Sequence, residues 1–230
     1  MRALRYRGPM LIVIALLVVT SAAWADITLL DFSGFDWFWP TDIGEVGSCY
    51  GAVGFVNSVD PGYLSFDYGL NQYTFHWDLA CFVSADTFGT FAVYEYDGST
   101  SSFNVYCDPI AGGTPAMFGI NPPNGVSPST WIDGDLVLGG MWMGNITIVV
   151  DLATGNGDVS GVLNLNAGSQ LGNIPVDQRQ PALTLAGVKF DPPNGPEGYT
   201  WQIDGQVFIE EPVPVEETSW GSIKQIGRGN

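Results

Sequence analysis

The chain has 230 residues, with 24 acidic and only seven basic side chains, and its formal net charge is −17. A protein this acidic repels nucleic-acid phosphates and anionic lipid headgroups, which argues against both as partners. Its composition also argues against disorder, because 46% of the residues are hydrophobic and 13% are aromatic, more than unfolded acidic chains contain.

Residues 1–25 have the composition of an export signal. Three arginines precede an apolar run from Met10 to Val19, and Ala23-Trp24-Ala25 forms a small-x-small cleavage site. We therefore expect a mature chain that begins at Asp26, is secreted or displayed at the cell surface, and carries a charge of 4 − 24 = −20. An uncleaved N-terminal anchor is the alternative, because residues 10–25 approach the ~17 residues that can span a bilayer. No later segment is apolar enough to predict membrane insertion of the mature domain.

From residue 26 to residue 211 the main pattern is alternation of apolar and polar side chains, which is typical of strands with one buried face. The clearest case is Ile146, Ile148 and Val150, followed by a Gly-Asn-Gly-Asp turn and a second apolar alternation, which together predict a β-hairpin. Further strands are predicted at 72–83, 88–97, 101–107, 182–190 and 199–210. We predict one all-β domain, a single antiparallel β-sandwich or flattened barrel of about ten strands, largely in meander order.

Residues 212–230 are predicted to form a Pro- and Glu-rich linker and a short C-terminal tail. The tail sequence WGSIK, residues 220–224, resembles the Trp-Gly-x-Ile-Lys endings of exported bacterial proteins of unassigned role. The strand-rich body from Gln72 to Leu165, with its NPPNG loop, is similar to the bodies of PEP-CTERM-type exported bacterial proteins. The chain lacks the C-terminal transmembrane helix and arginine cluster of that class, so the resemblance implies export and neither membrane processing nor an activity.

Three cysteines remain after the signal, Cys49, Cys81 and Cys107, so at most one internal disulfide can form. Cys81 and Cys107 are each in phase with the apolar residues of their predicted strands, and we favour a bond between them. In a flat three-strand meander they would lie about 9.6 Å apart, beyond the ~7 Å limit between Cα atoms, so this bond requires the sheet to curl. A bond from Cys49 to either partner and three free thiols are the alternatives.

No group of residues predicts catalysis. His76 is the only histidine, and no Gly-x-Ser-x-Gly elbow accompanies it. Glu95 lies between two tyrosines, where a carboxyl can acquire a raised pKa, but it also directly precedes a turn and is expected to face solvent. We assign no catalytic residue and favour a non-catalytic protein, with an enzyme that acts on glycans as the alternative.

Tryptophans are the candidate ligand-binding residues, because indole rings stack on sugars. We select Trp37, Trp39, Trp131 and Trp201 as carbohydrate-binding candidates, the alternative being that these rings belong to the core. Trp131 and Trp201 lie in two similar segments, PPNGVSPSTWIDG and PPNGPEGYTWQIDG, and are expected to occupy analogous places.

Calcium is the only metal ion that the composition favours, because it binds hard oxygen ligands from acidic loops. Its candidate ligands are Asp133, Asp135, Asp158 and Asp204. The overall prediction is an exported surface or matrix β-domain of unknown ligand, with a carbohydrate-binding module, assisted by calcium, as the alternative. Its partner would then be a glycan or another cell-surface component.

Overall fold

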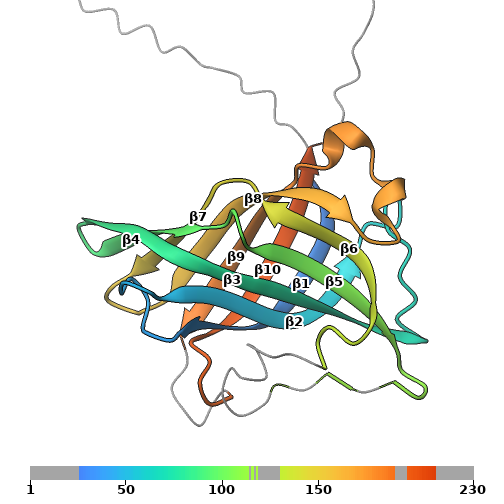
Figure 1. The fold of residues 1–230 in the computed structure, drawn as a ribbon, viewed down its shortest axis with the longest axis horizontal. Coiled ribbons are helices and arrows are strands. Elements are labelled where there is room, and N and C mark those ends of the chain that lie inside the picture. Colours follow the sequence, from blue (N-terminus) through green and yellow to red (C-terminus); the bar gives the residue numbers. More distant parts are fainter. Residues whose placement is uncertain (1–25, 114, 117, 119–129, 190–195, 211–230) are drawn as a thin grey trace, which may run out of the picture.

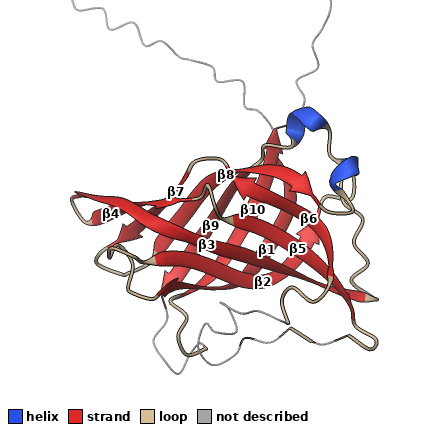
Figure 2. Cartoon of the chain, in the orientation of Figure 1, coloured by secondary structure: helices blue, strands red, loops and turns tan. Residues whose placement is uncertain are grey.

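The structure is a computed structural model that describes residues 26–113, 115, 116, 118, 130–189 and 196–210. It is all-β, with two short 3-10 helices at one end (Figure 2). The strands are β1 (Asp26–Trp39), β2 (Cys49–Val59), β3 (Asn71–Phe88), β4 (Phe91–Asp97), β5 (Ser102–Pro109), β6 (Asp135–Trp142), β7 (Asn145–Asp151), β8 (Gly157–Ala167), β9 (Ala182–Lys189) and β10 (Trp201–Glu210). The helices are η1 (Leu171–Asn173) and η2 (Val176–Gln178). The predicted signal and C-terminal tail lie outside the described residues.

All ten strands belong to one antiparallel sheet that closes on itself. β3, β2, β1, β10, β9 and β8 follow one another around the ring. Between β8 and β3 the wall is completed by β6 and β5 at one end and by β7 and β4 at the other. The prediction of an all-β fold, an antiparallel β-sandwich or flattened barrel of about ten strands, is confirmed.

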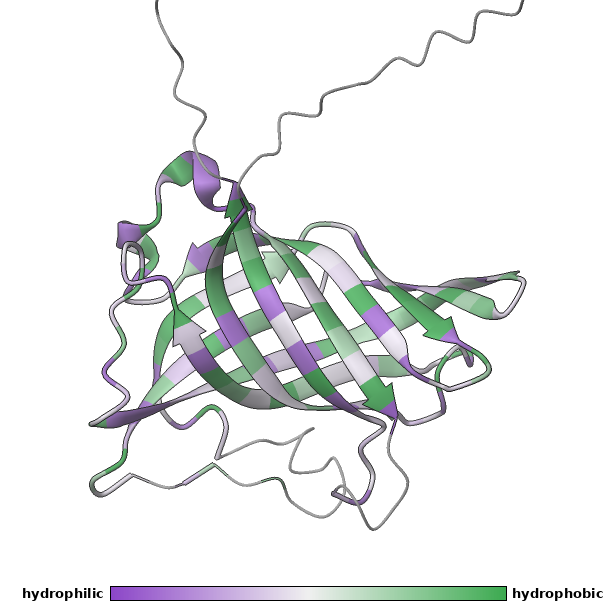
Figure 3. Ribbon diagram, turned by 180° about the vertical axis from the view of Figure 1, so that it is seen from behind, coloured by the Kyte–Doolittle hydropathy of each residue, from purple (hydrophilic) through white to green (hydrophobic). Residues whose placement is uncertain are grey.

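The ring is flattened, so that β2, β3 and β5 lie in front of β1, β10 and β9 and cross them (Figure 1). Side chains that alternate along each strand fill the space between the two layers, as in Phe32, Phe75 and Phe103, whose ring centroids lie 4.7 to 5.5 Å apart. Seen from behind, hydrophobic and hydrophilic residues alternate along the strands (Figure 3). The predicted hairpin is confirmed, with Val150 opposite Gly157 and all three alternating residues of β7 buried.

Glycines make room for the largest rings of the core. Trp201 lies over Gly157 and Gly187, where an added Cβ atom would come within 2.7 Å of its indole. Its Nε1 donates a 2.8 Å hydrogen bond to the carbonyl of Gly155. These glycines let the ring lie flat against two strands, where no side chain would fit.

The predicted meander is wrong around β3. This strand has 18 residues, and its first half pairs with β5 while its second half pairs with β4. The strands predicted at 72–83 and 101–107 are therefore direct antiparallel neighbours, not parallel strands separated by a third. Sequence alternation could not show this, because a long strand with two successive partners has the same period as a short one.

A second apolar cluster covers the outer face of β1 and β2. Trp37 and Val53 are buried there by Trp131 and Tyr199, which lie in the connections before β6 and β10. The Trp131 carbonyl accepts a 2.8 Å hydrogen bond from the Thr74 hydroxyl and so fixes its connection to β3. Within the described residues no helix is long enough and apolar enough to cross a membrane.

Candidate binding groove

The outer face of β9 carries small side chains. Ala182, Thr184, Ala186 and Val188 all point outward and are exposed, while Leu183 and Leu185 between them are buried in the ring. At the same level the neighbouring strands carry polar side chains, Asp158 and Ser160 on β8 and Asp204 and Gln206 on β10. β9 therefore forms the floor of a groove, and β8 and β10 form its walls.

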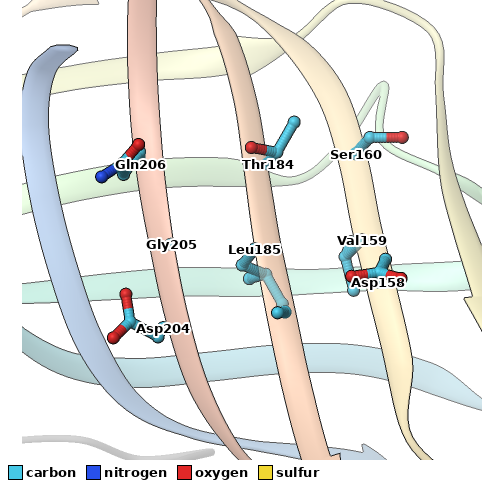
Figure 4. A pocket seen from close by; sticks show the side chains of 9 residues that line it. Asp158, Val159, Ser160, Thr184, Leu185, Asp204, Gly205 and Gln206 are labelled. Atoms are coloured by element: carbon cyan, nitrogen blue, oxygen red, sulfur yellow. The ribbon is translucent and has the colours of Figure 1, made fainter.

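The strand register sets the composition of the walls. Asp158 on β8 and Asp204 on β10 both lie opposite Ala186. One step further along, Ser160 and Gln206 both lie opposite Thr184. Two strand spacings separate the walls, about 9.6 Å between backbones, so the two carboxylates lie on opposite sides of the groove (Figure 4).

Three adjoining depressions show that the groove is continuous. The central one, of about 420 Å³, is lined by Asp158, Thr184, Ala186 and Gln206 among others (Figure 4). A second, of about 360 Å³, shares Asp158 and Ala186 with it and extends to Phe91 and Val188. A third, of about 370 Å³, shares Thr184 and extends to Phe208 and Glu210. No lysine or arginine lines any of these three depressions.

A hydrogen-bonded polar network adjoins the β10 wall. The Gln206 amide donates a 3.0 Å hydrogen bond to Asp31 on β1, and Asp31 also accepts a 3.2 Å bond from the Asn57 amide on β2. The Ser33 hydroxyl donates to Asn57 at 3.3 Å. Gln206 is thereby held in a fixed orientation beside the groove.

The candidate calcium ligands separate into two places. Asp158 and Asp204 face each other across the groove, whereas Asp135 begins β6 opposite Cys107, with Asp133 just before it. The described residues contain no group of three or more His, Cys, Asp or Glu side chains arranged to hold a metal. The four aspartates therefore do not form one site.

Three of the four candidate tryptophans are buried, which corrects the prediction that they bind sugar. Trp37 and Trp131 are 0% exposed in the outer cluster, and Trp201 is 1% exposed inside the ring. Trp39 is 50% exposed at the end of β1. Trp131 and Trp201 also do not occupy analogous places, since one packs outside the ring and the other inside it.

The predicted bond between Cys81 and Cys107 is wrong. Cys49 pairs with Cys81, with a sequence separation of 32, and Cys107 is a free thiol. The pairing of β2 with β3 shifts between Tyr50 and Ala52, so the alternation of β3 changes phase after Trp77. Cys81 is therefore exposed and directly opposite Cys49, while Cys107 packs against the core from β5.

Sequence reasoning missed a fully buried acid, Asp36. It points into the ring, is 0% exposed, and accepts a 2.9 Å hydrogen bond from the backbone N–H of Trp201. Burial raises the pKa of its carboxyl well above the usual value, against the lowering effect of that hydrogen bond. The Tyr50 hydroxyl lies close enough to influence this pKa, but Oδ2 and the hydroxyl do not reach hydrogen-bonding geometry. Asp36 is enclosed by core side chains, so its position suits a structural role.

The two residues considered for catalysis are not brought together. His76 is partly buried in β3, opposite Val53 and Asn104. Glu95 faces Thr147 across β4 and β7 and accepts a 2.9 Å hydrogen bond from its hydroxyl. Neither residue lines the groove.

No family model, curated protein or solved structure matches the chain.

Proposed function

We propose that this protein is an exported, non-catalytic surface or matrix domain that binds a linear, uncharged polysaccharide in the groove along β9. The observation that carries the proposal is the continuity of the groove from Val188 to Ala182. Six residue steps of a strand span about 20 Å. A site of this length, open on one side, suits an extended chain better than a compact small molecule.

The groove chemistry supports a polyhydroxylated ligand. Carboxylate, hydroxyl and amide groups of Asp158, Ser160, Asp204 and Gln206 can accept and donate hydrogen bonds along both walls. Phe91 and Phe208 provide apolar contact near the two ends. Anionic glycans are disfavoured, because the lining holds no basic side chain and the mature chain is strongly acidic.

A glycan array with the mature protein tests the proposal. We expect retention of neutral linear glycans, and loss of that binding in Ala186→Trp, whose indole fills the central depression. The matched control is Ala111→Trp, which adds the same ring to an exposed alanine in the turn after β5, outside the groove. Absence of glycan binding, or an equal effect of both substitutions, would contradict the proposal.

Calcium assistance is tested in the same assay. If Asp158 and Asp204 bind the glycan through a calcium ion, added calcium should strengthen binding of the wild type, and Asp158→Asn with Asp204→Asn should abolish that gain. If the carboxylates bind sugar hydroxyls directly, calcium should have no effect and the double variant should bind weakly in every buffer.

A further inference from the structure

β3 ends in a projecting arm whose outer edge is unpaired. Its pairing with β2 stops at Cys81, and its pairing with β4 continues to Phe88 (Figure 1). Residues 83–88 therefore have a neighbouring strand on one side only, and all six are exposed. Since the rest of the described sheet closes into a ring, this is its one long free edge.

A free edge offers backbone N–H and C=O groups to another strand. Phe88 and Phe91 flank the two-residue turn at Gly89 and Thr90 and pair with each other. Residues in this position of a hairpin are hydrogen-bonded to each other, so the backbone N–H and C=O of Phe88 point toward β4. Alternation along the strand then directs the backbone groups of Ala85 and Thr87 away from β4.

We propose that a second copy of this chain occupies the edge, with the two β3 arms pairing antiparallel about a two-fold axis and Ala85 facing Ala85 of the partner copy. In this register Ser84 faces Asp86, and the pair occurs twice. Val83 lies beyond the regular part of the edge, because the pairing of β3 with β4 shifts between Phe82 and Ser84. The hydroxyl of Ser84 can then donate to the Asp86 carboxylate, and the small Ala85 side chains leave room on the axis.

Side chains disfavour the neighbouring symmetric registers. Directly opposed residues of an antiparallel pair have their side chains on the same face of the sheet. With a two-fold axis perpendicular to the sheet, the sequence numbers of two opposed residues must therefore add up to an even number. One register further along, Asp86 would face Asp86 and bring two carboxylates together. Another step would place Asp86 against the Phe88 ring. The opposite shift would centre the pairing on Ser84 and extend it across the irregularity between Phe82 and Ser84. Only the Ala85-centred register avoids these contacts and stays within the regular part of the edge.

The arm is anchored where it leaves the ring. The Cys49–Cys81 disulfide joins β2 to β3 at the last residue pair, and the Phe82 N–H donates a 2.8 Å hydrogen bond to the Ser48 carbonyl one residue later. Exposed apolar side chains lie at both ends of the free edge, Val83 at 53% and Phe88 at 66% exposure. A partner strand would bury part of each.

Register-specific crosslinking tests the proposal. In a Cys107→Ser background, Ala85→Cys should form an intermolecular disulfide on mild oxidation, because Cα atoms of a hydrogen-bonded antiparallel pair lie about 5.5 Å apart. Thr87→Cys alone should not crosslink, since in this register the two copies of Thr87 lie four residues apart along the paired edge. A mixture of the Ser84→Cys and Asp86→Cys variants should crosslink again, because Ser84 faces Asp86, and peptide mapping should identify the joined residues.

Sedimentation equilibrium of the mature wild type supplies the second measurement. It should show dimers that dissociate on dilution, whereas Ala85→Pro, which removes an outward N–H, should remain monomeric with an unchanged circular dichroism spectrum. A wild type that is monomeric at every concentration would overturn the proposal. So would Thr87→Cys crosslinking as efficiently as Ala85→Cys, or a dimer that Ala85→Pro leaves intact.

Discussion

Asp36 accepts a 2.9 Å hydrogen bond from the backbone N–H of Trp201, which lies 165 residues later in the sequence. A second hydrogen bond lies beside it, because the N–H of Thr200, the residue before β10, donates a 2.8 Å bond to the Asp36 carbonyl. Together they join the first strand to the last, at the seam where the ring closes. A carboxyl group thus fixes the closure of the fold from inside the core.

We predict that Asp36→Asn stabilises the protein at neutral pH. Burial raises the folded-state pKa of the Asp36 carboxyl. The protonated carboxyl therefore contributes fully to the free energy of unfolding below the unfolded-state pKa of about 3.9, and this contribution is lost as pH rises toward the folded-state pKa. Asparagine keeps the acceptor for Trp201 and has no charge to bury. The gain in unfolding free energy should be on the order of 1–3 kcal/mol.

Urea unfolding of both proteins from pH 4 to pH 8 checks this prediction. The difference between Asp36→Asn and the wild type should grow as pH rises. A difference that is independent of pH would mean that the Asp36 carboxyl titrates alike in the folded and unfolded states.

Removing the disulfide with Cys49→Ser and Cys81→Ser should lower stability by about 3 to 4 kcal/mol. The bond closes a loop with a sequence separation of 32, and its loss gives that conformational freedom back to the unfolded chain. Denaturant unfolding of the wild type and the variant without a reducing agent measures the effect. Cys107→Ser is the matched control, because it removes a free thiol and should lower the free energy of unfolding by less. An equal loss of stability in both variants would contradict the Cys49–Cys81 pairing.

Gly187→Ala should destabilise the protein by about 1–3 kcal/mol, as overpacking of a core does. The new methyl group would lie 2.7 Å from the Trp201 ring, which is fixed by its hydrogen bond to Gly155. Gly172→Ala is the control, because nothing lies within 4 Å of an added Cβ atom there. Thermal unfolding of the two variants should separate them clearly, and similar melting temperatures would show that Trp201 can move aside.

The sequence by itself determined several of the strands and, where the alternation stays regular, their buried faces; β1, β2 and β6 were not predicted, and the face of β3 was wrong after Trp77. The alternation of Ile146, Ile148 and Val150 correctly placed them in the core, because a period of two is a local property of an extended chain. The glycine-rich turn after them correctly indicated the hairpin, because its residues favour the required backbone angles.

Tertiary structure decided which strands pair and which outer faces are covered. Backbone hydrogen bonds are the same for every strand, so alternation cannot choose between β4 and β5 as the partner of β3 or show that β1 pairs with β10. It also cannot show that Trp37, on the outer side of β1, is buried by Trp131 from a distant connection. The groove likewise depends on pairing, because Asp158 and Asp204 face each other only once β9 lies between their strands.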